Sequence, residues 1–211
     1  MQFFIAGHHY YNFMWQNGKI LGLLVVVTAL IFSAGCTSSD IGPATPVITP
    51  VATTGTGDET FLSIYDASLI VIENGLKDVD ANLYSSVSNA GITYSPSKLR
   101  LAALDLKNAA DNYHTSLLKI EDFAIKENEY KRNEHLKYLS TIGTVGGNIA
   151  EAAQAEGDND YRLAMNYVEM GRTHLQRIEG VPNQAHRDLI GVMKVHLDDY
   201  VQRMRDEISS S

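Results

Sequence analysis

The sequence predicts an all-α fold, an antiparallel up-and-down bundle of four to five helices that follows a signal segment and a disordered linker. From Asp58 onward, apolar residues recur every three or four positions, which is the period of an amphipathic helix. The body contains no run of alternating apolar and polar residues that would indicate a strand. Stretches rich in glycine, proline and asparagine divide the pattern into helical segments, and such segments bury their apolar faces by packing together.

The first helix is expected from Asp58 to about residue 88. Asp58 and Glu59 would lie at its amino end, where the helix dipole favours negative charge. The segment 89–91 (Asn-Ala-Gly) is a helix stop. The inward stripe consists of Phe61, Tyr65, Leu69, Ile72, Leu76, Val79, Leu83 and Val87.

The second helix is expected to begin at Ser95-Pro96, with Ser95 as the N-cap and Pro96 in the first helical position. Its stripe alternates small and large residues in a pattern close to a coiled-coil seam: Leu99, Ala103, Leu106, Ala110, Tyr113, Leu117 and Ile120. This pattern suits close antiparallel packing within the chain. The same seam would also allow two chains to pair, so the sequence is equally consistent with a dimer.

The charged segment 126–134 is consistent with either a turn or the middle of a long helix, because it contains neither glycine nor proline. One helix from Ser97 to Glu156 would be about 90 Å long, roughly twice the length of the first helix. We therefore expect a break within 126–133. A third helix follows, in which Gly143, Gly146 and Gly147 would allow a close approach to a neighbour or a kink. Its stripe is Leu136, Leu139, Ile142, Val145, Ile149 and Ala153.

Two further helices complete the bundle. Residues 157–159 (Gly-Asp-Asn) form a turn signal, and the fourth helix is expected over about 160–179. Residues 180–183 (Gly-Val-Pro-Asn) end it, and the fifth helix begins near Pro182. The inward residues of these two helices are Tyr161, Ala164, Tyr167, Val168, Gly171, Leu175 and Ile178, then Leu189, Val192, Met193, His196, Leu197, Tyr200, Val201 and Met204.

The amino-terminal third has the features of a targeting segment. Lys19 precedes thirteen uncharged apolar residues at 20–32, and small residues follow them. A secretory signal has this order, whereas a bilayer-spanning helix needs about twenty apolar residues. An uncleaved anchor stays open if residues 33–35 also enter the lipid. We assign residues 1–35 to the signal, with translation starting at Met1 or at Met14.

The residues around the only cysteine indicate a lipid anchor. Ala34-Gly35-Cys36 resembles the lipobox of bacterial and archaeal lipoprotein precursors, although Ser33 stands where leucine is usual. The resemblance covers roughly residues 14–57 and implies that Cys36 becomes the lipidated amino terminus after cleavage. Residues 36–57 form a flexible linker rich in threonine, proline and glycine, and residues 58–208 form the helical domain.

Charge and location together exclude some partners. All twenty-five acidic residues and sixteen of the seventeen basic residues follow Cys36, so the mature chain has a net charge of −9. Nucleic acids need a basic surface, so we do not expect the protein to bind them. Its membrane contact would be through lipid on Cys36, on the extracytoplasmic side of the cell membrane, rather than through charge.

No motif in the body predicts catalysis or a cofactor. Di-iron bundles use two Glu-x-x-His pairs, whereas this chain has one related pair, Asp111 with His114, which is a weak metal candidate. Four other histidines lie on separate predicted segments, and we expect each at the surface or at its boundary: His135, His174, His186 and His196. A Ser-His-Asp arrangement assembled in space remains open.

The expected function is therefore binding rather than chemistry. The sequence predicts a membrane-anchored lipoprotein whose helical domain is a non-catalytic interaction or structural module with a protein partner at the cell surface. The alternative is a bundle that binds a small ligand or a metal and serves a membrane partner. Nine tyrosines follow Cys36; Tyr84, Tyr94 and Tyr138 lie near predicted helix ends or off the main stripes. Those three would form either a partner-binding patch or a solvated rim.

Overall fold

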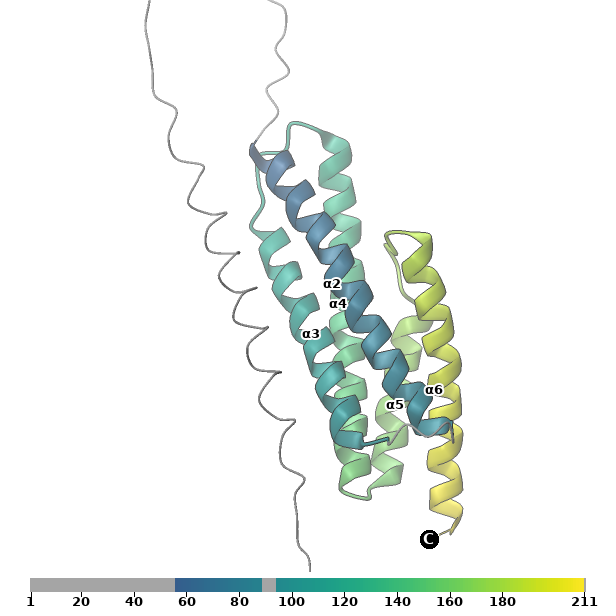
Figure 1. The fold of residues 1–211 in the computed structure, drawn as a ribbon. Coiled ribbons are helices and arrows are strands. Elements are labelled where there is room, and N and C mark those ends of the chain that lie inside the picture. The colour runs from purple at the N-terminus through teal and green to yellow at the C-terminus, as the bar shows by residue number, and fades with distance from the viewer. Residues whose placement is uncertain (1–55, 89–93, 211) are drawn as a thin grey trace, which may run out of the picture. The chain divides into compact units, whose positions relative to one another are not determined.

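The computed structural model describes residues 56–88 and 94–210 and forms an all-α bundle over that part of the chain (Figure 1). The described residues contain five helices and no strand, which confirms the predicted fold class. The helices are α2 (Thr56–Val87), α3 (Pro96–Leu118), α4 (Lys126–Gly157), α5 (Tyr161–Gln176) and α6 (Gln184–Ser210). The predicted signal segment, Cys36 and nearly all of the linker lie outside the described residues.

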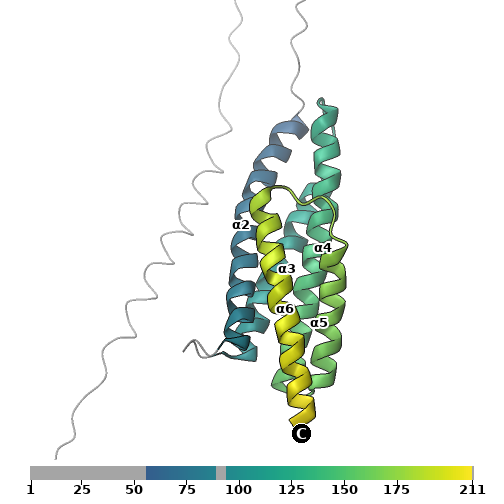
Figure 2. The same ribbon diagram turned by 90° about the vertical axis from the view of Figure 1, so that its right-hand side faces the viewer.

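The five helices pack in a closed sequence of neighbours. Each helix contacts the next along the chain, and α6 closes the ring against α2 (Figures 1 and 2). Consecutive helices run in opposite directions, so with five members the closing pair, α2 and α6, must run in the same direction. The carboxyl ends of α2, α4 and α6 therefore lie at one end of the bundle, opposite the end where α2 begins.

The predicted stripes form the core, except that Val192, which was predicted to face inward from the last helix, is 45% exposed. Every member of the α2 stripe is buried or half-buried, and the α3 stripe behaves in the same way. Burial of one large aliphatic or aromatic side chain contributes roughly 1.5–3 kcal/mol, so these stripes are the main source of stability in a body without a disulfide. The largest fully buried side chains include Phe61, Leu76, Leu99, Leu106, Tyr138, Leu139 and Tyr200.

Glycines allow α4 to approach α3 closely, as the sequence predicts. A Cβ on Gly143 would lie 2.7 Å from Asp111 Oδ1, and one on Gly146 would lie 2.8 Å from the Ala103 carbonyl oxygen. The second contact is with backbone, which cannot move aside as a side chain can. Gly146 is thus required for the α3–α4 packing distance, and α4 is nevertheless continuous through it.

The break between the second and third helices is not where the sequence predicts it. The connection spans 119–125, and the charged segment 126–134 forms the first turns of α4. Asp122 has a φ of 61°, which turns the chain before α4 begins. The buried carboxylate of Asp58 on α2 then accepts the backbone N–H groups of Ala124 and Ile125, at 2.8 and 3.2 Å, and the Asn128 side chain.

Two other boundaries differ slightly from the predicted ones. The helix α5 ends at Gln176 rather than near 179, and α6 begins at Gln184, two residues after Pro182, near which its start was predicted. Between them, Gly180 has a φ of 66°, and a Cβ there would lie 2.1 Å from the Glu134 carbonyl oxygen. The close contact with α4 explains why this turn needs glycine. Within the described residues, none of the helices combines the length and apolar character that crossing a bilayer requires.

Candidate functional site

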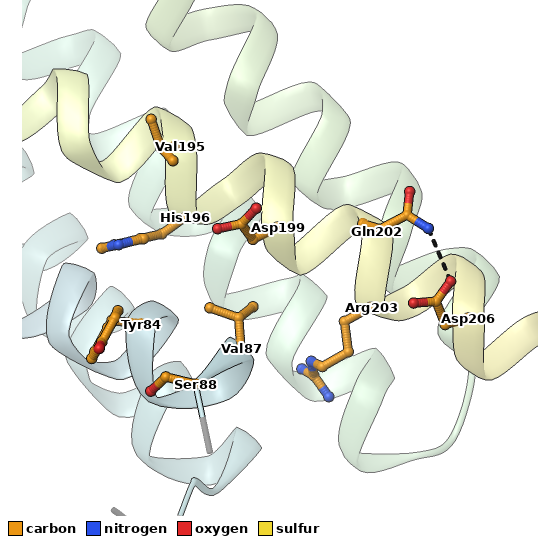
Figure 3. A pocket seen from close by; sticks show the side chains of 9 residues that line it. All are labelled: Tyr84, Val87, Ser88, Val195, His196, Asp199, Gln202, Arg203 and Asp206. Atoms are coloured by element: carbon orange, nitrogen blue, oxygen red, sulfur yellow. Dashed lines mark hydrogen bonds between the residues drawn. The ribbon is translucent and has the colours of Figure 1, made fainter. Parts of the chain in front are cut away.

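The candidate site is a surface cleft of about 510 Å³ between the end of α2 and the second half of α6, which we call the α2–α6 cleft. Figure 3 shows its two walls, with Tyr84 opposite His196 and Arg203 extending from α6 toward the α2 side. Its lining combines apolar, aromatic and charged groups, contributed by Tyr84, Val87 and Ser88 at the end of α2 and by Val195, His196, Asp199, Gln202, Arg203 and Asp206 of α6.

The cleft follows from the positions of these residues on their helices. On α6 they recur every three or four residues beside the buried stripe of that helix, so they share one flank. The parallel neighbour α2 ends at Val87, and the flank of α6 continues past it. Tyr84 is 45% exposed and Val195 is 57% exposed, which leaves apolar surface available at the mouth.

A histidine–aspartate pair joins the two walls. His196 Nδ1 on α6 lies 2.7 Å from Asp80 Oδ1 on α2, and the His196 ring packs against Tyr84 with 5.3 Å between ring centroids. Both members of the pair are largely shielded from solvent. This contact fixes the relative position of the parallel helices at the cleft.

The inner side of the cleft adjoins a buried charged group that we call the Glu156 cluster: Tyr94, Glu156, Tyr200 and Arg203. The Tyr94 and Tyr200 hydroxyls both donate to Glu156 Oε2, and Arg203 Nη1 lies 2.8 Å from Oε1. Burial, together with the Glu156 charge, raises the pKa of the Tyr94 phenol. Burial also raises the pKa of the Tyr200 phenol, aided by Tyr94 and Glu156. Both phenols therefore remain hydrogen-bond donors.

Arg203 holds this cluster through its rings as well as its charge. Its guanidinium carbon lies 4.9 Å from the Tyr94 ring centroid and 4.8 Å from that of Tyr200. Such cation–π contacts are strongest where the cation is partly desolvated, as it is here. Arg203 Nε and Nη2 and the Ser88 hydroxyl have no partner among the described residues, so the inner wall leaves two guanidinium donors and one hydroxyl unpaired within that part of the chain.

The free charge at the mouth of the cleft is negative. Asp199 and Asp206 are exposed, and within the described residues the Asp206 carboxylate accepts the neutral side chain of Gln202, at 2.9 Å. The Arg203 charge is already compensated by Glu156. The cleft thus offers an aromatic ring and an aliphatic side chain beside two uncompensated carboxylates, which is a surface suited to a cationic group.

A second buried polar group, which we call the His135 cluster, consists of Ser68, His135, Tyr138 and His186. His135 Nε2 lies 2.7 Å from Ser68 Oγ, a pairing that superficially resembles a nucleophile and its base. Ser68, however, donates to the Tyr65 carbonyl oxygen at 2.6 Å. Ser68 and His135 are each at most 1% exposed. Among the described residues, no carboxylate pairs with His135 Nδ1 to orient the ring. The pair lacks the access and the third group that nucleophilic catalysis requires.

The weak metal candidate is not assembled into a site. Asp111 is exposed on α3 and pairs with Lys107 at 2.6 Å, and His114 is half-buried one turn further on. Over residues 56–88 and 94–210, no three histidine, cysteine or acidic side chains are grouped so that they could hold a metal ion. Cys36, the predicted lipid site, lies outside the described residues.

Two of the four histidines were wrongly predicted. His174 is exposed and His196 is half-buried, as expected, but His135 and His186 are fully buried. They are accommodated because Ser68 and Asn183 each pair with one ring nitrogen, so only the other nitrogen is left unpaired. The three candidate tyrosines lie in different places and do not form one patch. Tyr84 lines the cleft, the Tyr94 hydroxyl donates to Glu156, and Tyr138 is in the core.

The Glu156 cluster was missed at the level of sequence, although a signal was present. Glu156 continues the apolar stripe of α4 one turn after Ala153, so an acid occupies an inward position. An acid there requires partners. The partners are Tyr94, Tyr200 and Arg203. The two tyrosines lie 62 and 44 residues from Glu156 in sequence, so helical spacing does not identify them.

Comparison with known proteins adds no assignment. No family model matches the chain, and neither a curated protein nor a solved structure is significantly similar to it. The function must therefore be argued from the cleft and the two clusters.

Proposed function

We propose that the protein is a lipid-tethered, extracytoplasmic binding module without catalytic activity, and that its partner docks on the α2–α6 cleft. The observation that carries this proposal is the pairing of exposed apolar surface with uncompensated charge at one place, Tyr84 and Val195 beside Asp199 and Asp206. The groups best suited to chemistry have structural partners instead: His196 with Asp80, His135 with Ser68, and Glu156 with Arg203.

The chemistry of the cleft indicates a basic partner. A lysine or arginine side chain carries an apolar stem and a cationic head, which match the ring of Tyr84 and the carboxylates at the mouth. The mature chain has a net charge of −9, so long-range attraction would act in the same direction. The partner that fits is a protein with a basic segment at the same membrane surface.

A second candidate function is favoured by the size of the cleft. Its volume of about 510 Å³ falls within the range of small-molecule sites, roughly 300–1,000 Å³. An organic amine would use the same ring and carboxylates as a basic side chain. The protein partner is the stronger proposal because the cleft is an open surface site rather than an enclosed one.

Site-specific photo-crosslinking in the native membrane tests the docking face. A photoreactive residue at Val195 would lie beside the cleft, whereas one at Leu101 on α3 would be similarly exposed, at 61% against 57%. We expect the Val195 position to give one discrete crosslinked species that Leu101 does not give. Equal labelling from both positions would place the interface elsewhere.

Charge variants test whether the cleft recognises a cation. The double substitution Asp199→Asn and Asp206→Asn should abolish the Val195 crosslink, while Asp66→Asn with Asp105→Asn removes two exposed carboxylates elsewhere and should preserve it. All four aspartates are exposed, so neither pair should change stability by more than about 0.5 kcal/mol. A crosslink that survives the cleft substitutions would contradict a basic partner.

The anchor is tested separately. Cys36→Ser in the full precursor should abolish incorporation of a labelled fatty acid and release the processed protein from membranes. If this variant is still cleaved and still partitions with membranes, the lipoprotein assignment is wrong. The docking experiments do not depend on that result, because they examine the helical domain.

A further inference from the structure

The end of the bundle at which α2 begins carries large apolar side chains that are exposed. Four of them, which we call the apolar tip, are 42% to 62% exposed: Leu62, Leu118, Ile125 and Tyr130. Leu62 and Tyr130 are on the second turns of α2 and α4, Leu118 is the last residue of α3, and Ile125 directly precedes α4. Figure 1 shows the start of α2 and the connection from α3 to α4 together at this end.

Hydrogen bonds hold the backbone of this end in place. The buried Asp58 carboxylate on α2 accepts the N–H groups of Ala124 and Ile125, and Arg132 Nη1 on α4 donates to the Ile120 carbonyl oxygen at 2.5 Å. The connection between α3 and α4 is therefore fixed to both α2 and α4. The exposure of the apolar side chains on either side of it is a property of the fold.

A lysine directly follows three of these four apolar residues in the sequence. The pairs are Leu118-Lys119, Ile125-Lys126 and Tyr130-Lys131, and all three lysines are exposed. Within the described residues, none of the other eight large apolar side chains that are exposed precedes a lysine. Lysine has an apolar stem with a cationic head, and tyrosine has an apolar ring with a polar hydroxyl. Such side chains are suited to the boundary between lipid hydrocarbon and headgroups.

The chain enters the helical domain at this same end. The helix α2 begins at Thr56, twenty residues after Cys36, the predicted lipid site. Twenty residues span at most about 70 Å when fully extended. The 32 residues of α2 make that helix about 48 Å long. The opposite end, which carries the α2–α6 cleft, could reach the bilayer only if most of the available length ran back along the bundle. The apolar tip is therefore the end that the anchor brings to the bilayer.

Charge does not provide the attraction to lipid at this end. Its basic groups are the three lysines and the half-buried Arg132. Five exposed acidic residues share the same end: Glu59, Glu121, Asp122, Glu127 and Glu129. The charges nearly cancel, and their mixed signs match a zwitterionic headgroup, which contains a phosphate and an ammonium group. The driving force for contact is the removal of apolar side chains from water.

We propose that the apolar tip rests on the bilayer surface, with Leu118, Ile125 and Tyr130 inserted among the lipid headgroups and the adjacent lysines extending to lipid phosphates. This inference rests on the lipid anchor of the proposed function. It adds an orientation, because a bundle that stands on this tip presents the α2–α6 cleft away from the membrane. Weak affinity of the tip for lipid is sufficient, since the tether keeps it at a high effective concentration near the bilayer.

Tryptophan fluorescence of the full lipidated chain in phosphatidylcholine vesicles tests this contact. Trp15 is the only tryptophan and lies in the predicted signal segment, so the unsubstituted protein sets the background. Tyr130→Trp places a reporter at the tip, and Leu101→Trp places one near the opposite end at almost equal exposure, 61% against 62%. With bromine on the lipid acyl chains, we expect most of the Tyr130→Trp emission and little of the Leu101→Trp emission to be quenched.

Two matched double variants in the Tyr130→Trp background show whether the apolar side chains cause the contact. Leu118→Glu with Ile125→Glu should abolish the quenching, while the protein still floats with the vesicles through its lipid. Ile70→Glu with Val71→Glu changes two similarly exposed apolar residues in the middle of α2 and should retain the quenching. Loss of quenching in the second variant alone would contradict the assignment. If the first variant does not fold, the comparison of Tyr130→Trp with Leu101→Trp decides.

The outcomes separate this inference from the anchor itself. Protein that floats with the vesicles but shows no quenching of Tyr130→Trp would overturn the docking of the tip and leave the anchor intact. A blue shift of that emission without quenching would mean that a second copy of the chain, rather than lipid, covers the tip. Protein that does not float would overturn both proposals, and equal quenching at both positions would mean that the bundle lies along the membrane instead.

Discussion

The Glu156 cluster joins the residue Tyr94 before α3 to α4 and α6, and the His135 cluster joins α2, α4 and α6, but the two clusters satisfy their buried polar groups differently. In the Glu156 cluster, a carboxylate receives two phenol hydroxyls and an arginine, so the carboxylate is satisfied and its charge is balanced, while Arg203 Nε and Nη2 have no partner among the described residues. In the His135 cluster, all groups are neutral, and three atoms have no partner within residues 56–88 and 94–210.

The difference shows that a buried carboxylate must be satisfied, whereas individual donors and neutral acceptors around it need not be. A buried carboxylate is so costly without partners that the chain supplies three of them from distant segments. Burial of a neutral imidazole or phenol costs less free energy, so one of its polar atoms can remain without a protein partner. Removal of one partner from the Glu156 cluster should therefore lower the unfolding free energy. In the His135 cluster, protonation of a histidine should lower it.

The largest expected effect is in the Glu156 cluster. Glu156→Gln removes the counter-charge of Arg203, whose side chain is only 23% exposed. Breaking a buried pair by removing one partner costs about 3–5 kcal/mol, and the partial exposure of Arg203 places the expected loss of unfolding free energy near 3 kcal/mol. Urea unfolding monitored by circular dichroism measures it.

The matched control for this substitution is Glu151→Gln, on the exposed face of the same helix. It should change the unfolding free energy by less than about 0.5 kcal/mol. Similar values for the two variants would mean that the Glu156–Arg203 pair does not stabilise the bundle.

An intermediate effect is expected from pH in the His135 cluster. His135 has a folded pKa of about 4 against an ordinary 6.5, so the unfolded chain binds a proton that the folded chain excludes. Its contribution to stability is complete above about pH 6.5 and is lost as the pH falls toward 4. Between pH 7 and pH 5 the loss is about 2 kcal/mol, and His186 acts in the same direction.

Two substitutions separate this effect from general acid sensitivity. His135→Gln should reduce the pH dependence between pH 7 and pH 5 by about 2 kcal/mol, whereas His174→Gln changes an exposed ring and should leave it intact. Direct titration of His135 in the folded wild type supplies an independent measurement. A midpoint near 6.5 there would show that burial does not depress its pKa.

Helical spacing in the sequence was enough to predict the fold class and the core stripes, because it is a local property. The connection between α3 and α4 was misplaced because Asp58, sixty-six residues before Ala124, supplies the carboxylate that its backbone requires. A long-range hydrogen bond of this kind leaves no periodic signal near the turn.

The candidate site was harder to predict for the same reason. The cleft exists because α2 and α6 lie side by side in parallel, and their contact joins His196 to a residue 116 positions earlier. The sequence indicated Tyr84 and Tyr94 as candidates. It did not show that Tyr84 lines a cleft with Arg203, that Arg203 lies over the Tyr94 ring, or that Tyr138 is in the core. Inward polar residues such as Glu156 are the signal that would have helped.

The smallest effects come from removing one hydroxyl from each cluster, and their difference tests the comparison most directly. Tyr200→Phe deletes a donor to a buried carboxylate, and hydrogen bonds to charged groups contribute about 1.5–3 kcal/mol. Tyr138→Phe deletes a neutral hydroxyl that has no partner among the described residues, so almost no loss of unfolding free energy is expected. Both tyrosines are fully buried and both substitutions keep the ring, so differences in packing largely cancel. If Tyr138→Phe costs as much as Tyr200→Phe, then charge is not what distinguishes the two clusters.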